Sequence, residues 1–256
     1  MSNQWVIVES NGQISEVIMN RPEKRNALNP ELITELTQAF QQLNSDAHTR
    51  IIILKSKEGA FCAGADLSYL KSLSEFTHQE NIQDSTRLKN LFELIYQSPK
   101  IVISQVEGAA LAGGCGLAFL ADFCFASPES TFGYTEARIG FVPALVMVYL
   151  REKLNQNQLN EWLLTAQIFD STKAYNDGLV YRISNDISRE VNDFARNLLK
   201  SVSSDSTSRI KSMLRKMPQD WNESLTFAAE QNALARKTDD CQKGISAFLN
   251  KEKISW

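Results

Sequence analysis

Four consecutive apolar residues, Ile51-Ile52-Ile53-Leu54, constrain the fold more than any other feature of this 256-residue sequence. Successive side chains of a strand point to opposite faces of a sheet, so a continuous apolar run of this length predicts a strand covered on both faces. Such strands are typical of parallel sheets enclosed between helices. The run therefore favours an α/β fold.

The segments before this run alternate between strand and helix patterns. Asn11-Gly12 separates two β-rich runs, 5–8 and 14–19, and this dipeptide is a strong local signal for a hairpin. Asn29 suits a helix N-cap and Pro30 suits the first helical turn. The apolar residues that follow at helical spacing predict a helix with one buried face.

The alternation continues beyond the run and then stops. Helical patterns cover 88–95 and 117–120, and strand patterns cover 101–104 and 124–126. Beyond about residue 190 only helical spacing remains. We therefore predict an α/β core over residues 1–195 and a helical C-terminal region over 196–256, which packs on the core or on a neighbouring subunit.

The charge and the hydropathy pattern argue against two classes of partner. With 27 Lys and Arg against 30 Asp and Glu, the net charge is −3, so we expect no nucleic-acid partner. The longest apolar candidate, 101–125, is interrupted by polar residues and glycines, and residues 1–5 do not begin a secretory signal. We expect no membrane partner.

The cysteines and histidines form no metal-binding or disulfide pattern. We expect the cysteines to be reduced, buried thiols of a cytoplasmic protein, and we expect no metal site and no histidine base. The residues concerned are Cys62, Cys115, Cys124, Cys241, His48 and His78.

Three segments, 60–67, 108–117 and 131–144, carry the candidate chemistry. Taken alone, each has an ordinary explanation, such as a tight Gly-Gly turn or a glutamate at a helix start. Taken together, they supply two strand-to-helix turns with free backbone N–H groups and one carboxylate, Glu136. Two fixed donors and one carboxylate are what proton abstraction beside a carbonyl group requires.

These segments belong to a set of ordered blocks by which the chain resembles the crotonase (enoyl-CoA hydratase/isomerase) family over essentially its whole length. The blocks are Asn20-Arg21-Pro22, Arg25-Asn26-Ala27-Leu28-Asn29, Phe61 to Leu67, Gly113-Gly114-Cys115, Phe132-Gly133 leading to Glu136, Gly140 and Pro143, and the ending Gly244 to Leu249.

The resemblance implies a spiral of ββα units with a helical C-terminal region, assembled as trimers or hexamers. It implies a CoA thioester as substrate, with no cofactor beyond the coenzyme A that the substrate carries. By motif position, the N–H groups of Ala65 and Gly113 form the oxyanion hole. The segment Arg25 to Leu28 holds the adenine end of CoA, and Ala27 allows close approach to its backbone. Further contacts with the substrate are expected at Arg25, Leu28, Ala63, Asp66, Gly116, Tyr134 and Ala144, and Phe248 and Lys251 either reach CoA or have surface or core roles.

Gly116 departs from the two-glutamate hydratases of this family, which carry one acid there and another at the position of Glu136. We therefore expect Glu136 to be the one principal catalytic carboxylate. One open interpretation is a Δ3,Δ2-enoyl-CoA isomerase, in which Glu136 moves a proton from C2 to C4.

The other interpretation is a hydratase or dehydratase similar to the methylglutaconyl-CoA hydratase branch of leucine degradation. That branch also pairs a glycine with the retained glutamate and carries a stretch resembling 140–146. Here Gly116 would leave room for a branch at C3. This local similarity favours a hydratase acting on a branched enoyl-CoA such as 3-methylglutaconyl-CoA.

Three more side chains have ordinary alternatives to a role at the site. Asp66 suits the cap of the helix that follows it, Tyr134 either packs or donates a hydrogen bond, and Arg138 fits a structural ion pair better than a contact with a distal carboxylate.

A non-catalytic acyl-CoA-binding protein is the rival class, but a pure binder has no need of Glu136. Thioester hydrolysis and decarboxylation, which the same oxyanion hole would serve, stay open.

Overall fold

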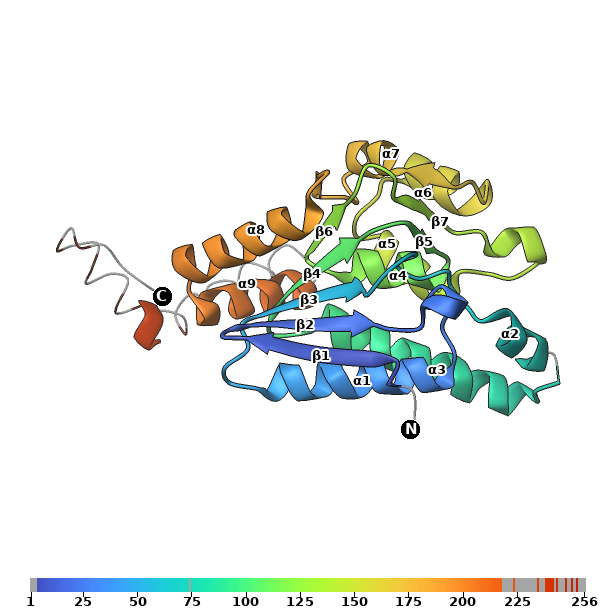
Figure 1. Ribbon diagram of the computed structural model, residues 1–256, viewed down its shortest axis with the longest axis horizontal. Coiled ribbons are helices and arrows are strands. Elements are labelled where there is room, and N and C mark those ends of the chain that lie inside the picture. The colour runs from blue at the N-terminus through green and yellow to red at the C-terminus, as the bar shows by residue number, and fades with distance from the viewer. Residues whose placement is uncertain are drawn as a thin grey trace.

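A six-stranded sheet in the order β1-β2-β3-β4-β6-β9 forms the centre of the computed structural model (Figure 1). β1 and β2 are antiparallel, and every other neighbouring pair is parallel. The strands are β1 (Val6–Asn11), β2 (Ile14–Met19), β3 (Ile51–Ser56), β4 (Ile101–Val106), β6 (Phe123–Ala126) and β9 (Arg182–Ile183). The structure describes residues 4–73, 75–217, 223, 234, 238–241, 243, 247, 250 and 252.

β3 is covered on both faces, as its apolar run predicts. Ile52 and Leu54 belong to the larger core cluster, which includes residues of α1 (Pro30–Ser45) and α3 (His78–Tyr96). Ile51 and Ile53 belong to a second cluster, which includes residues of α8 (Ile187–Ser201). In Figure 1, α1 and α3 lie on one side of the sheet and α8 lies on the other. The predicted α/β class is therefore confirmed.

The local signals at the N-terminal end are also confirmed. Gly12 adopts φ +62° in the hairpin turn, a conformation that glycine reaches without a steric penalty. The Asn29 side chain accepts a hydrogen bond from the Leu32 N–H at 3.0 Å and so caps α1. One side of α1, including Leu32, Leu36 and Phe40, is fully buried, and this burial joins the helix to the sheet.

A second, three-stranded sheet in the order β5-β7-β8 was not predicted. β5 (Ala109–Leu111) and β7 (Thr131–Gly133) run parallel, and β8 (Phe169–Asp170) is antiparallel to β7. Strands of two or three residues are too short to show a period in the sequence. Two isolated bridges, Cys62↔Ala110 and Leu28↔Ala65, extend this pairing beyond β5.

Shorter helices connect the strands and cover the ends of both sheets (Figure 1). They are η1 (Pro22–Lys24), α2 (Leu67–Leu73), α4 (Gly113–Leu120), η2 (Glu136–Ile139), α5 (Ala144–Leu150), α6 (Gln156–Leu164), α7 (Ser171–Asn176) and α9 (Ser204–Lys216). None of the helices in the described part of the chain is both long and apolar enough to cross a membrane.

The predicted boundary between residues 195 and 196 falls inside α8. Ala195 is fully buried in the second core cluster, between the sheet and α8, and Leu198 and Leu199 pack against the same cluster. The helix therefore belongs to the core on both sides of the boundary. α9 follows and is helical, as predicted. Most of the region after Met217 lies outside the described residues, and the division into two regions stays a prediction.

Asp122, in the loop between α4 and β6, ties α9 to the sheet. Its two carboxylate oxygens accept hydrogen bonds from the Val102 N–H at 2.8 Å, from Lys211 Nζ at 2.6 Å and from Arg215 Nη2 at 2.7 Å. The three charged side chains are only 11–14% exposed. Lys211 also donates to the Lys100 carbonyl, and the Arg215 guanidinium lies 4.2 Å from the centre of the Tyr96 ring. Asp122 is the carboxylate that balances both charges in a place shielded from water.

We predict that Asp122→Ala lowers the free energy of unfolding by about 3–5 kcal/mol, because it leaves two buried cations without their partner. Urea denaturation measures this loss. Asp193→Ala is the control, since its ion pair with Arg189 is exposed and long, at 3.6 Å, and should cost under about 1 kcal/mol. Equal losses in the two variants would contradict the prediction.

Candidate active site

Two backbone turns, 62–65 and 111–114, pack directly against each other, and the Leu111 N–H donates to the Cys62 carbonyl at 2.9 Å. A Cβ atom at Gly114 would lie 2.2 Å from the Cys62 carbonyl oxygen, and one at Gly64 would lie 2.9 Å from the Leu111 carbonyl oxygen. Gly64 also has φ +86°. Both positions therefore require glycine, and the two turns are held in direct contact.

Each turn leaves one backbone N–H group unpaired. Leu28 N donates to the Gly64 carbonyl at 2.7 Å, and Asp66 N donates to the Leu28 carbonyl at 2.8 Å. Ala65 lies between these two bonds, so its own N–H points away from Leu28. Gly113 is the first residue of α4, where an N–H has no partner within the helix. Among the described residues neither N–H has a hydrogen-bond partner, which is the condition that the predicted oxyanion hole needs.

Ala112, directly before Gly113, has a strained backbone. Its φ of 51° and ψ of −125° are rare for a residue with a side chain. The Ala112 N–H donates to the Gly133 carbonyl at 2.8 Å, which fixes the turn against β7. Strain of this kind is retained only where the surrounding contacts enforce it, and it sets the direction of the next N–H.

Glu136 is brought to the same edge as the two turns by the small sheet. β5 and β7 are parallel, so their carboxyl ends lie side by side. β5 leads into the turn at Gly113, and β7 leads through Tyr134 to Glu136, the first residue of η2. The structure thus brings the segment that carries Glu136 and the turn that carries Gly113 to the same edge of the small sheet.

The Glu136 carboxylate is poorly solvated. Its Oε2 atom is buried and has no hydrogen-bond partner among the described residues. Burial raises the pKa of Glu136 above its ordinary value, and a backbone hydrogen bond offsets this only in part. An unpaired oxygen on a group with a raised pKa is suited to taking up and returning a proton.

Gly116 does not leave the space that we expected for a branched acyl chain. A Cβ atom there would lie 2.5 Å from Val146 Cγ1 and 3.1 Å from Phe92 Cζ. The expectation of room at this position is therefore wrong, because side chains from α5 and α3 fill it. The sequence predicted the helix over 88–95 that carries Phe92 but no helix at Val146, and it could not show that the two side chains meet at Gly116.

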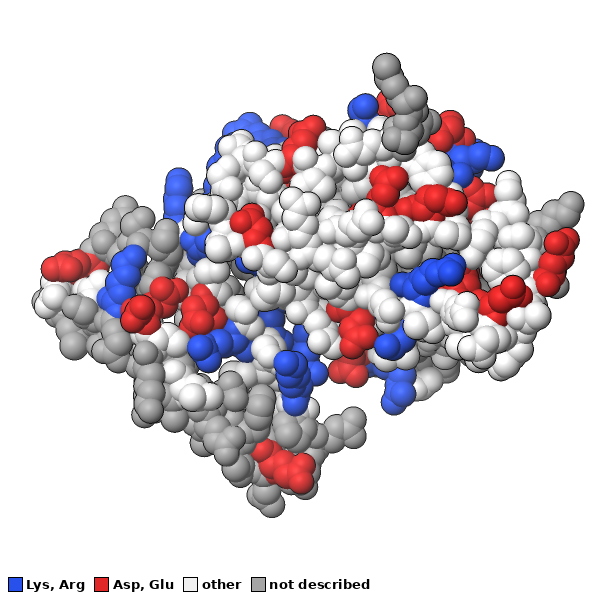
Figure 2. Space-filling view, turned by 90° about the horizontal axis from the view of Figure 1, so that it is seen from below, with Lys and Arg blue, Asp and Glu red and all other residues white. Residues whose placement is uncertain are grey.

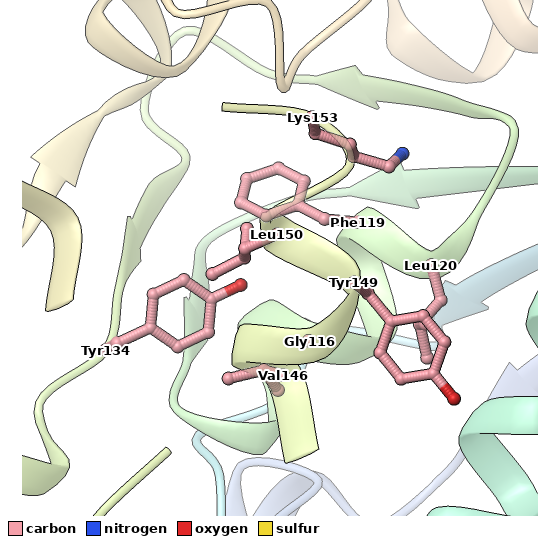
Figure 3. Close-up of a pocket in the computed structure, with 8 residues that line it drawn as sticks. All are labelled: Gly116, Phe119, Leu120, Tyr134, Val146, Tyr149, Leu150 and Lys153. Carbon is pink, nitrogen blue, oxygen red and sulfur yellow. The ribbon is translucent and has the colours of Figure 1, made fainter. Parts of the chain in front are cut away.

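A small cavity of about 10 Å³ lies beside Gly116, between α4 and α5 (Figure 3). Tyr134, predicted either to pack or to donate a hydrogen bond, is 1% exposed and contributes to the wall. Its ring packs edge-on to Trp162, while its Oη atom has no hydrogen-bond partner among the described residues. An unpartnered buried hydroxyl costs about 1–3 kcal/mol.

The segment from Arg25 to Leu28 lies beside the first turn, as the CoA prediction requires. Arg25 is exposed and adopts φ 51°, and its carbonyl accepts a hydrogen bond from the Ala63 N–H at 3.0 Å. Ala27 and Leu28 are buried. The Asn26 side chain bonds the backbone of Arg21 and Ala60 at 2.8 and 2.9 Å and so holds the segment in place.

Asp66 caps α2, as predicted, by accepting a hydrogen bond from the Ser68 N–H at 2.8 Å. Its other oxygen pairs with Arg21 at 2.7 Å, and both side chains are buried. Burial raises the pKa of Asp66, but hydrogen bonds from Arg21 and from the Ser68 N–H outweigh it and hold the pKa below its ordinary value. Arg21 also donates to the Ala27 carbonyl at 2.8 Å. It thus joins both segments of the site, a role that sequence reasoning missed although the residue lies in a recognised block.

The remaining predicted residues are not joined to these turns. Ala144 is exposed at the start of α5. Arg138 is also exposed, and no ion pair links it to any described residue, so the structural pairing expected for it is not found in this part of the chain and stays a prediction. Phe248 and Lys251 lie outside the described residues. A substrate contact stays a prediction for Ala144, Phe248 and Lys251. For Arg138 the sequence favoured a structural ion pair over a substrate contact.

The described residues suggest neither a metal centre nor an extended basic surface. No group of three or more His, Cys, Asp or Glu side chains lies close enough to hold a metal ion within the described part of the chain. On the face shown in Figure 2, basic and acidic side chains of the described residues are interspersed.

Comparisons with known proteins agree with this arrangement. The sequence profile described as enoyl-CoA hydratase/isomerase matches residues 9–256. A Thermus thermophilus protein named provisionally as an enoyl-CoA hydratase is 36% identical over 94% of this chain and 96% of its own length. A mitochondrial Delta(3,5)-Delta(2,4)-dienoyl-CoA isomerase of Pongo abelii is 28% identical over 97% of this chain and 80% of its own length. The crystal structure of an enoyl-CoA hydratase from Shewanella pealeana superposes with a TM-score of 0.94 at 27% identity, covering 100% of this chain and 97% of that one.

The raised pKa of Glu136 predicts a pH-dependent stability. Because the folded state favours the protonated carboxyl group, wild-type stability is fully present below the unfolded pKa, about 4.5, and is partly lost as the pH rises through the folded value. Glu136→Gln removes this loss. We expect the variant to melt higher than wild type at pH 7 and to lose this advantage near pH 4.

Thermal melts at both pH values make the comparison, with Glu152→Gln, a change at an exposed carboxylate, as the control for removing one negative charge. A variant whose advantage is the same at pH 4 and pH 7 would refute the assignment of the raised pKa to Glu136.

Proposed function

The chain belongs to the enoyl-CoA hydratase/isomerase family, and from this premise we propose that it is an enoyl-CoA hydratase or dehydratase working through a thioester enolate. The observation that carries the proposal is the half-buried Glu136 carboxylate, whose Oε2 atom is buried and unpartnered, at the edge where the Ala65 and Gly113 N–H groups have no partner among the described residues. The fold shared with a solved hydratase supports it.

In the proposed reaction Glu136 acts twice. It removes a proton from water as the water oxygen bonds to C3, and the electrons of the C2–C3 double bond move to the thioester oxygen. The N–H groups of Ala65 and Gly113 stabilise the resulting enolate, and loss of one such donor typically slows a reaction about 100- to 1,000-fold. Glu136 then gives the proton to C2. Dehydration is the same sequence in reverse.

A Δ3,Δ2-enoyl-CoA isomerase is the second candidate. The apolar side chains of Val146 and Phe92 surround the position of the missing acid at Gly116, and this favours a single base that shuttles one proton between C2 and C4. A non-catalytic acyl-CoA-binding protein is disfavoured, because an unpaired, desolvated carboxylate contributes nothing to binding a neutral thioester.

The proposed substrate is a CoA ester whose adenine end lies along Arg25 to Leu28, with no cofactor besides this coenzyme A. The branched substrate 3-methylglutaconyl-CoA remains part of the proposal. Since Gly116 leaves no room for a branch, the methyl group of this substrate would need to lie in another part of the acyl site. Its distal carboxylate has Arg138 as an exposed candidate partner.

We further propose a homotrimer or a dimer of trimers in the cytoplasm. Apolar side chains of η2, α6 and the loop between η2 and α5 are exposed, among them Ile139 (69%), Val142 (61%) and Leu164 (75%). Exposed apolar side chains that cluster in this way are typical of subunit interfaces. Cys62, Cys115 and Cys124 are buried free thiols, which suits a reducing compartment.

Glu136→Gln should bind CoA esters as wild type does but lose turnover by about 100- to 10,000-fold, because only proton transfer is removed. The assay compares 3-methylglutaconyl-CoA, crotonyl-CoA and trans-3-hexenoyl-CoA, and calorimetry measures binding of the CoA ester. Glu152→Gln is the matched control. Wild-type turnover in Glu136→Gln would exclude Glu136 from the mechanism.

The wild-type substrate profile separates the candidates. Hydration of 3-methylglutaconyl-CoA alone would support the branched-substrate proposal. Conversion of trans-3-hexenoyl-CoA without any hydration would identify the isomerase. Binding of all three without turnover would favour the acyl-CoA-binding protein.

A second acid at position 116 should need two changes. Gly116→Glu alone should fold less stably and gain no hydration, because its Cβ would clash with Val146 Cγ1 at 2.5 Å. Adding Val146→Ala should recover stability and raise crotonyl-CoA hydration above that of the single variant. The prediction is tested by thermal melts and by turnover, and equal values for the single and double variants would show that Val146 is not the obstacle.

A further inference from the structure

The cavity beside Gly116 is closed by apolar side chains and has room for about one water molecule. Its volume is about 10 Å³, near the smallest space that holds a water. Figure 3 shows how α4 and α5 enclose it. The lining residues are Gly116, Phe119, Leu120, Tyr134, Val146, Tyr149, Leu150 and Lys153.

One polar group of this wall is buried and lacks a partner. The Tyr134 hydroxyl points toward Gly116 and Val146 (Figure 3) and has no hydrogen bond to any described residue. Lys153 Nζ donates to the Ala121 carbonyl at 3.2 Å. The Tyr149 hydroxyl points away from Tyr134 and Gly116 in the same view. A buried hydroxyl without a protein partner is commonly satisfied by a water molecule or a ligand.

Tyr134 also lies at the edge of the small sheet that carries Glu136, directly after β7. Its hydroxyl lies near the Cys115 thiol, a weak hydrogen-bonding group whose geometry falls short of a hydrogen bond, and it also interacts electrostatically with the Glu136 carboxylate. Burial raises the pKa of Tyr134 well above its ordinary value, so the group stays a neutral hydroxyl that can both donate and accept a hydrogen bond.

We propose that the Tyr134 hydroxyl hydrogen-bonds the water whose oxygen adds to C3 of the enoyl-CoA, a role that the second acid has in two-glutamate relatives. This inference rests on the proposed hydratase function. Glu136 takes one proton from the water and later gives it to C2, and the new C3–O bond uses the oxygen lone pair. The Tyr134 oxygen accepts a hydrogen bond from the proton that the water keeps, so Tyr134 neither gains nor loses a proton.

Tyr134→Phe tests this role, because it removes the hydroxyl and keeps the ring. Hydration of crotonyl-CoA should fall about 10- to 100-fold in kcat/KM, the loss expected for one catalytic hydrogen bond. Exchange of the C2 protons of trans-3-hexenoyl-CoA in deuterated water, followed by NMR, should stay within about twofold, since it requires only a base and an oxyanion hole. Tyr149→Phe is the matched control and should change neither rate.

The outcomes distinguish this inference from the proposed function. Wild-type hydration by Tyr134→Phe overturns the role of Tyr134, whereas retention of C2 exchange in Glu136→Gln overturns the proposed function itself. Loss of both hydration and exchange in Tyr134→Phe also overturns the inference, because the tyrosine would then act through Glu136. The melting temperature of Tyr134→Phe should not fall, since no hydrogen bond within the protein is lost, and retained exchange shows that its site is intact.

Discussion

The contact between the turns 62–65 and 111–114 is the constraint on which the site depends. No Cβ fits at Gly114 or Gly64, so the two backbones touch, and each turn is fixed on its outer side by pairing with Leu28 or with the Gly133 carbonyl. The two unpaired N–H groups are held by backbone atoms alone. Donors fixed in this way need no rearrangement when negative charge develops, which is where preorganised sites gain most of their effect.

The unsatisfied polar groups of this region gather at one edge of the small sheet. Elsewhere, Asp122 is paired with three donors and Asn26 with two backbone groups, and Arg50 Nε is the one other buried side-chain nitrogen or oxygen of the described residues that lacks a partner. At the edge, by contrast, Glu136 Oε2 and Tyr134 Oη have no partner among the described residues. Since each such group costs stability, their concentration beside the free N–H groups is more consistent with a site that water or substrate completes than with a packing role.

Local signals in the sequence predicted the large sheet well, but the sheet that builds the site was missed. The run 51–54 and the cap at Asn29 act within a few residues, so the sequence shows them directly. β5, β7 and β8 are specified by long-range pairing such as Ala110↔Phe132, which leaves no periodic pattern. The carboxylate and the two turns were identified by resemblance and by residue type, whereas their common edge follows only from that pairing.

Gly116 illustrates why a missing acid is not the same as an empty space. The glycine is matched by Val146 on α5 and Phe92 on α3, whose atoms occupy the place of any side chain at 116. The glycine on α4 and the apolar side chains on α5 and α3 therefore depend on each other. An acid at position 116 would require changes on these neighbouring helices as well. In this arrangement α4 contributes the backbone N–H of Gly113 but no acidic side chain at position 116. The side chains proposed for the proton chemistry, Tyr134 and Glu136, both follow β7 and are two residues apart, so the proposed chemistry falls within one short stretch of chain.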